Sequence, residues 1–250
     1  MGELAGHVAF VSGGTGGLGR AICHALARAG ANVSVGYHRA HEAADALVRD
    51  LAGVPRGHLG VQAAVTDSSA LLRAAQMVEA RYGRCDILVN CAGTTRFVPH
   101  DALASLDDEL IDEIFRVNVR GVLANTRAFI RLLEQSAAAV VVNISSIAGT
   151  TAMGSNVAYC ASKAAVNNLT LSLGRAFAPK VRFVSVAPGL VDTEFVRGLD
   201  ASWREEQIDR TPMKRLASPE QVADAVLAVI TKLKFTTGVV VPVDGGRPLA

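Results

Sequence analysis

Seven short apolar runs, rich in β-branched residues, alternate with helical patterns along the whole chain. This alternation is typical of repeated βαβ units, in which helices cover both faces of a parallel sheet. Because βαβ crossovers are right-handed, the pattern predicts an α/β fold with a doubly wound parallel sheet of seven strands. Ligands of such sheets bind at the carboxyl ends of the strands, so the residues that follow each predicted strand are the first candidates for a site.

The predicted elements account for most of the chain and leave no place where a domain boundary is expected. The predicted strands are His7–Ser12, Asn32–Tyr37, Leu59–Val65, Asp86–Asn90, Ala139–Ser145, Val181–Ala187 and Gly238–Val243. The predicted helices are Leu18–Ala29, Glu42–Leu51, Ser69–Tyr82, Asp107–Glu134, Tyr159–Phe177 and Pro219–Thr231. No internal repeat, linker or low-complexity tract occurs, so we expect a single domain over residues 1–250.

Composition and charge exclude several classes of function. The formal net charge is +2, and Arg and Lys are scattered without a run of like charge, so neither nucleic acid nor an anionic membrane is an expected partner. No uninterrupted apolar stretch approaches the roughly 20 residues that a membrane span requires, and there is no basic leader before a long apolar run. The four cysteines show no CxxC spacing, so we expect free thiols, no metal site and a cytoplasmic protein.

A glycine-rich loop follows the first predicted strand and opens the first predicted helix. From Ser12 it reads SGGTGGLG. Glycines let a backbone turn sharply and approach a pyrophosphate closely, and the amides at the start of the helix then meet its charge. In this strand–loop–helix context the loop predicts a dinucleotide site. Its candidate cofactor-binding residues are Gly13, Thr15, Gly16, Gly17, Leu18 and Gly19.

The end of the second predicted strand bears on which dinucleotide binds. A site that prefers NAD usually offers a carboxylate to the adenosine ribose here, but this chain reads Tyr37-His38-Arg39. The planar guanidinium of Arg39 suits a 2′-phosphate, so His38 and Arg39 are predicted to bind the cofactor, with NADP(H) preferred over NAD(H). NAD(H) stays an alternative, since Arg39 could be a solvated loop residue.

Tyr159 and Lys163 are spaced i to i+4 at the start of a predicted helix, downstream of Ser146. That spacing places the phenol and the ammonium on one helical face, about one turn apart. A phenol has a pKa near ~10 when unperturbed, so it shuttles protons at neutral pH only if a nearby cation favours the phenolate. Lys163 could be that cation. Taken alone, the pair could also be a surface feature of an amphipathic helix.

Together these motifs resemble the short-chain dehydrogenase/reductase family over essentially the whole chain. Further matching features are NCAG from Asn90, Asn118 in RVNVRG, Ser146 thirteen residues before Tyr159, Pro188-Gly189, and VDGG from Val243. The tail segment MKRLASPEQVADAV is most similar to the branch of 3-oxoacyl-[acyl-carrier-protein] reductases. The resemblance implies a Rossmann-type fold and an NAD(P)-dependent oxidoreductase that acts on CH–OH groups.

The resemblance also implies a catalytic tetrad of Asn118, Ser146, Tyr159 and Lys163. Tyr159 would give a proton to the carbonyl oxygen as hydride arrives, and Ser146 would hydrogen-bond that oxygen. Lys163 would hold the nicotinamide ribose and help to keep the pKa of Tyr159 low. Asn118 would distort its helix locally and anchor a water that connects Lys163 to solvent.

Further cofactor contacts follow from the same resemblance. They are Asn90 and Gly93 beside the riboses with Ala92 between them, Pro188 and Gly189 around the nicotinamide, and Val191 and Thr193 at its carboxamide. One departure is Ala64-Val65, where the family usually has Asp-Val, so adenine recognition at Val65 should be weaker or supplied otherwise. Family members often assemble through the last strand and the long fourth and fifth helices, which implies a homotetramer, or a dimer, with Asp244 near the interface.

Substrate recognition is expected in the region Leu190–Leu216, which should form a lid. It carries three cations that could meet an anionic carrier, Arg197, Arg204 and Arg210. The turn Glu134–Ala139 lacks the basic cluster with which many carrier-dependent relatives dock an acidic partner, and Lys180 and Arg182 compensate only in part.

The leading hypothesis is NADPH-dependent reduction of a ketone, above all a 3-oxoacyl thioester, to a secondary alcohol. The substrate would be a small-molecule ketone or acyl thioester, with acyl carrier protein as a candidate partner. The alternative is a secondary-alcohol, sugar or hydroxysteroid dehydrogenase, because specificity on this fold depends on the lid. A more distant alternative is a non-catalytic dinucleotide sensor, which would not need Ser146, Tyr159 and Lys163 together.

Overall fold

The computed structural model describes residues 2–51, 53–54, 56–198 and 200–249. They form one seven-stranded sheet in the order β3-β2-β1-β4-β5-β6-β7, in which all neighbouring strands are parallel. The order reverses between β1 and β4, so the predicted doubly wound fold is confirmed. The strands are β1 (Val8–Ser12), β2 (Asn32–Tyr37), β3 (Leu59–Gln62), β4 (Ile87–Asn90), β5 (Ala139–Ile144), β6 (Val181–Pro188) and β7 (Val239–Val243).

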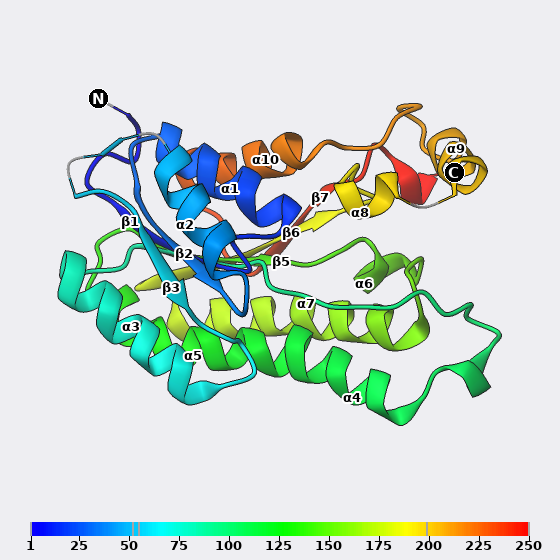
Figure 1. Cartoon of the computed structure of the whole chain (residues 1–250), viewed down its shortest axis with the longest axis horizontal. Helices are drawn as coiled ribbons and strands as arrows, with labels where there is room; N and C mark the ends of the chain where they lie inside the picture. The colour runs from blue at the N-terminus through cyan, green and yellow to red at the C-terminus, as the bar shows by residue number, and fades with distance from the viewer. Residues whose placement is uncertain (1, 52, 55, 199, 250) are drawn as a thin grey trace.

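Helices cover both faces of the sheet (Figure 1). One face carries α1, α2 and α10, and the other carries α3, α5 and α7. The long helices are α1 (Gly17–Arg28), α2 (His41–Asp50), α3 (Ser68–Tyr82), α4 (Asp108–Phe115), α5 (Gly121–Leu133), α7 (Val157–Phe177), α9 (Ala201–Asp209) and α10 (Pro219–Thr231). Two helices of four residues each, α6 (Ala148–Thr151) and α8 (Glu194–Arg197), lie in the loops after β5 and β6.

Strand β1 explains why the apolar runs are continuous and do not alternate with polar residues. Ala9 and Val11 pack into the core beneath α1, α2 and α10, whereas Val8 and Phe10 pack into the core beneath α3 and α5. The Phe10 ring meets the ring of Phe129 on α5 at a centroid distance of 4.4 Å. A strand that is buried on both faces has no polar side, which is the pattern expected of a parallel sheet.

Two element boundaries differ from prediction for a physical reason. The predicted strand Leu59–Val65 ends at Gln62 because the chain turns at Ala64, whose carbonyl accepts the amide of Asp67 at 2.9 Å. The side chain of Asp67 then caps α3. Helix α7 begins at Val157, two residues before Tyr159, because the side chain of Asn156 caps it by accepting the amide of Tyr159 at 2.7 Å.

The predicted helix Asp107–Glu134 is interrupted in its middle. It consists of α4, a single π-helical turn over Arg116–Arg120, and α5. The predicted local distortion at Asn118 is therefore confirmed, since this residue lies in the π turn. Turns of this kind are frequent at functional sites, because one extra residue re-aims the side chains of the helix.

The expected lid, Leu190–Leu216, contains α8 and α9; Leu199 lies outside the described residues. Within the part of the chain that is described, none of the helices is both long and apolar enough to cross a membrane.

Candidate active site

The glycine loop joins β1 to α1 at the switch point of the sheet. Gly13 has φ +66°, and a β-carbon there would lie 2.8 Å from Cα of Ala92, so the loop requires glycine at this position. Helix α1 starts after Gly16 without a capping side chain and without an acidic residue in its first turn. Its first amides therefore remain available to an anion, and the residues fit the pyrophosphate of a dinucleotide.

The loops after β4 and β6 form the walls beside this helix end. The Ser12 hydroxyl accepts the amides of Cys91 and Ala92 at 3.2 and 3.4 Å, which holds the β4 loop against the glycine loop. Across the cleft, a β-carbon on Gly17 would lie 3.6 Å from Cβ of Thr193. The structure thus brings the predicted residues Ala92 and Thr193 to the glycine loop, and it adds Ser12, which sequence reasoning missed.

The other residues predicted at the end of β6 and in the loop after it contact three neighbouring segments. Pro188 is buried, and its carbonyl accepts the amide of Ile147 at 3.0 Å. Gly189 donates its amide to the carbonyl of Val243 at 3.0 Å, and Val191 forms an isolated parallel bridge with Ala217. These contacts join the loop after β6 to the loop after β5 and to the end of β7.

The opposite end of the cleft holds the residues predicted to meet the adenosine. His38 and Arg39 are exposed after β2, and the His38 carbonyl accepts the Gln62 side chain at 3.1 Å. A β-carbon on Gly121 of α5 would lie only 3.0 Å from the side chain of Val65. The side chain of Val65 is therefore directed at α5.

Tyr159 and Lys163 lie on the same face of α7, as their spacing predicts. The Lys163 ammonium is 5.6 Å from the centroid of the Tyr159 ring and donates a hydrogen bond to the carbonyl of Ile144 at 2.9 Å. Only 6% of Lys163 is exposed. The end of β5 thus fixes the ammonium directly beside the phenol.

Ser146 follows β5 on the neighbouring loop. Its hydroxyl accepts the amide of Ala148 at 3.1 Å, which starts the turn into α6. A hydrogen bond between the side chains of Ser146 and Tyr159 lowers the pKa of the phenol. The two hydroxyls that the sequence assigns to one carbonyl oxygen are therefore neighbours.

Burial sets the protonation of this pair. It raises the pKa of the Tyr159 phenol, and the hydrogen bond from Ser146 only partly offsets this effect. Burial also lowers the pKa of Lys163 to about 8. The pKa of Tyr159 therefore lies above its ordinary value in this structure, because the loss of hydration outweighs the hydrogen bond that lowers it.

Asn118 connects the π turn to the catalytic helix. Its Oδ1 accepts the amide of Thr94 at 2.8 Å, and its Nδ2 donates to the Thr94 carbonyl at 3.0 Å and to the Ser162 hydroxyl at 3.1 Å. Ser162 in turn donates to the carbonyl of Tyr159 at 2.7 Å. A β-carbon on Gly93 would lie 3.4 Å from Asn118 Oδ1 and 3.8 Å from Lys163 Nζ, so Gly93 borders the same place.

The side chain of Asn90, a residue predicted to border the riboses, belongs to a buried amide network. It pairs with Asn143 in the register of β4 and β5, and its Nδ2 donates to Asn143 Oδ1 at 2.8 Å. The network continues through Asn125 and Thr170, and all of these side chains are buried. The side chain of Asn90 is thus committed to holding β4, β5, α5 and α7 together.

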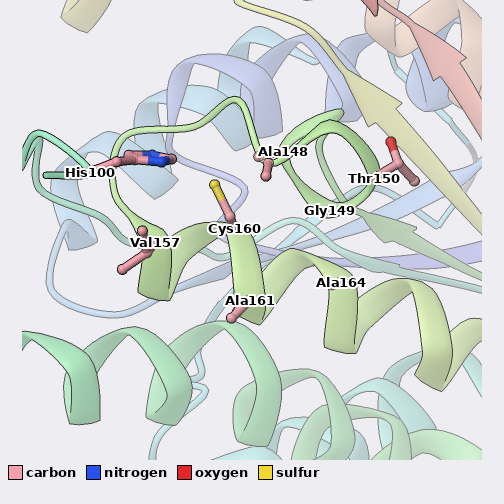
Figure 2. A pocket seen from close by; sticks show the side chains of 9 residues that line it. His100, Ala148, Gly149, Thr150, Val157, Cys160, Ala161 and Ala164 are labelled. Carbon is pink, nitrogen blue, oxygen red and sulfur yellow. The ribbon is translucent and has the colours of Figure 1, made fainter.

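A cavity of about 330 Å³ lies beside the site, between α6 and the first turns of α7. Figure 2 shows Cys160 and His100 at this cavity, whose other lining residues are small. Ser146, Tyr159 and Lys163 do not line it. All four cysteines are free, and the described residues hold no group of three His, Cys, Asp or Glu side chains that could bind a metal ion.

The arrangement agrees with comparisons against known proteins. The family model for short chain dehydrogenases matches residues 7–203. The chain belongs to the short-chain dehydrogenase/reductase family. Members of this family are oxidoreductases that use NAD(P)(H) and act on alcohol and ketone groups, so the chain is an enzyme of this type.

Three relatives of this short-chain dehydrogenase illustrate the range of the family. A protein assigned as ketoacyl reductase 2 of the granaticin polyketide synthase of Streptomyces violaceoruber is 37% identical, over 97% of this chain and 96% of the relative. The cis-4-hydroxycyclohexanecarboxylate dehydrogenase of Sinomonas cyclohexanicum is 34% identical, over 98% of both chains. A crystal structure of a family member from Burkholderia xenovorans has a TM-score of 0.89 and 37% identity, with 98% of each chain covered.

The lowered pKa of Lys163 makes stability depend on pH. Between pH 8 and 10.5 the unfolded chain holds a proton on this amine that the folded chain has released, so the free energy of unfolding rises with pH in this window. Replacing Lys163→Met removes this contribution. From pH 7 to pH 9.5 the stability of the wild type should rise by about 2 kcal/mol relative to the variant, measured by urea unfolding of both proteins. A stability difference that does not change with pH would contradict the lowered pKa.

Proposed function

We propose that this short-chain dehydrogenase reduces a ketone to a secondary alcohol with NADPH, and that its main substrate is a 3-oxoacyl thioester. The observation that carries the proposal is the grouping of Ser146, Tyr159 and Lys163 at the carboxyl edge of the sheet, beside the uncapped start of α1. This edge is where a doubly wound sheet binds its ligand.

A nicotinamide cofactor bound in this cleft would supply the hydride, which is the step that amino-acid side chains cannot perform. The amides at the start of α1 would hold its pyrophosphate, and Ala92 and Gly93 would border its riboses. Thr193, which lies against Gly17, would close the cleft from the side of β6. Lys163, buried near Gly93, would bind ribose hydroxyls.

The side chains of the site then stabilise and neutralise the negative charge that forms on the carbonyl oxygen. Tyr159 donates its proton to this oxygen, and its raised pKa keeps the phenol protonated and ready to donate at neutral pH. Ser146 donates a hydrogen bond to the same oxygen as it becomes negative. Lys163 stabilises the negative charge left on Tyr159, since its ammonium is 5.6 Å from the ring centroid.

We infer the substrate class from the relatives and from the contacts of two basic side chains. The ketoacyl reductase relative favours a thioester, whereas the cyclohexanecarboxylate dehydrogenase relative favours the alternative, a secondary-alcohol dehydrogenase. Two cations that could have steered an acyl carrier protein are already engaged. Lys180 lies 3.6 Å from Glu134, and Arg182 donates to main-chain carbonyls after and within α10. We therefore favour a small thioester over a carrier-bound one.

Assembly as a homotetramer in the cytoplasm is part of the proposal. Apolar side chains are exposed on α4, α5 and α7, which lie on one face of the sheet, and others are exposed on and beside β7. They are Phe115, Leu123, Leu171, Phe235 and Val239. Exposed apolar side chains at these places suit burial between copies of the chain.

Tyr159→Phe tests the proposed proton donor. Removing the hydroxyl should lower kcat for ketone reduction by at least about 100-fold, because proton transfer by a positioned side chain contributes that much. NADPH oxidation would be followed against acetoacetyl-CoA, a β-keto ester and a cyclic diketone, with cofactor affinity measured by fluorescence titration and expected to be retained. Tyr82→Phe removes another buried tyrosyl hydroxyl, which donates to the carbonyl of Gly57, and should leave kcat unchanged. An unchanged kcat in Tyr159→Phe would refute the assignment.

Arg39→Ala tests the cofactor preference. Loss of the guanidinium should raise the KM for NADPH about tenfold and leave the KM for NADH nearly unchanged, because only NADPH carries the 2′-phosphate. Arg49→Ala, at an exposed arginine in the last turn of α2, is the matched control. Equal catalytic efficiency of the wild type with both cofactors would contradict the preference.

A further inference from the structure

Asp192 lies between the cofactor cleft and the two helices of the lid. Its carboxylate is 3.2 Å from Nη2 of Arg197 in α8, and it accepts a hydrogen bond from Nη2 of Arg204 in α9 at 2.9 Å. One side chain therefore ties both helices to the short segment that follows β6. In Figure 1, α8 and α9 lie beyond the carboxyl end of this strand.

The same segment faces the cofactor cleft through its neighbouring residues. The amide of Asp192 donates to the carbonyl of Ala217 at 2.9 Å, so the main chain is fixed here. Thr193 lies near Gly17 at the start of α1, where an added β-carbon would be 3.6 Å from its Cβ, and its hydroxyl accepts the amide of Val196 at 3.4 Å as the cap of α8. A change at the start of α1 can thus reach α8 and α9 through two adjacent residues.

Burial indicates that the contact with Arg204 matters more than that with Arg197. The side chain of Asp192 is 22% exposed and that of Arg204 is 35% exposed, whereas that of Arg197 is 61% exposed. The Nε of Arg204 is buried and lacks a hydrogen-bond partner. A partly buried guanidinium with an unsatisfied donor depends strongly on its remaining carboxylate, while an exposed ion pair contributes little.

We propose that Asp192 is a positioning residue that couples the cofactor cleft to the placement of α9. It acts through Arg204, and it fixes the position of α9 relative to Val191 and Thr193. These two residues lie next to the nicotinamide end of the cleft. This inference rests on the proposed function, since it takes a dinucleotide to be the ligand of the cleft. Substrate would then meet a lid that cofactor binding has already ordered.

The test compares Asp192→Asn with the wild type in two measurements that require no ketone. The Kd for NADPH, measured by fluorescence titration, should rise about three- to tenfold, the range expected for a partly buried charged contact. Hydrogen exchange of the amides in α9 should accelerate, and NADPH should slow it in the wild type but much less in the variant. Glu206→Gln removes the ion pair between α9 and Arg210, the residue that follows it, and leaves Asp192 intact, so it should behave as the wild type.

A second variant separates the proposed contact from a general loss of folding. Arg204→Gln should reproduce the effects of Asp192→Asn, and the double variant should be no worse than either single variant, because the two residues act as one unit. Unchanged Kd and exchange in Asp192→Asn would overturn this inference alone. Additive effects of the two substitutions would also overturn it. Absence of any dinucleotide binding by the wild type would overturn the proposed function, and the coupling with it.

Discussion

The site depends on the removal of water from Tyr159 and Lys163. Lys163 is almost fully buried, and α6 packs closely on the main chain of α7 beside it: a β-carbon on Gly149 would lie 2.7 Å from the carbonyl of Lys163, so only glycine permits this contact. With water excluded, the pKa of the phenol rises and that of the ammonium falls to about 8. The raised pKa keeps Tyr159 protonated at neutral pH, and a pKa of about 8 still leaves most of Lys163 charged there.

Buried amide networks hold this pair in place from two sides. Asn118, in the π turn between α4 and α5, is hydrogen-bonded to Thr94 and to Ser162 on α7. Asn90 and Asn143 connect the neighbouring strands beneath it. Since unsatisfied buried amides are costly, these contacts specify one arrangement of strands and helices. These networks therefore hold the helix that carries Tyr159 and Lys163 in one position.

The sequence predicts the sheet, most of its helices and the common face of Tyr159 and Lys163, because periodicity and spacing are local properties of the chain. The place of Ser146 beside them is implied by the family resemblance. The sequence does not reveal Ser12 or Ser162, whose partners are distant in the sequence. It does not reveal that the side chain of Asn90 joins a buried network, because the register of β4 against β5 decides which amides meet in the core. It does not reveal that the pKa of Tyr159 is raised, because burial depends on packing. The short helices α6 and α8 leave no periodic signal at four residues each.

The most direct measurement is the pH dependence of kcat for ketone reduction at saturating NADPH. If burial sets the protonation of the site, the rate should be level from pH 6 to about 8 and then fall as Lys163 loses its proton, while Tyr159 remains protonated throughout. A rate that falls well below pH 7, or that is still level at pH 9.5, would contradict this account of Tyr159 and Lys163.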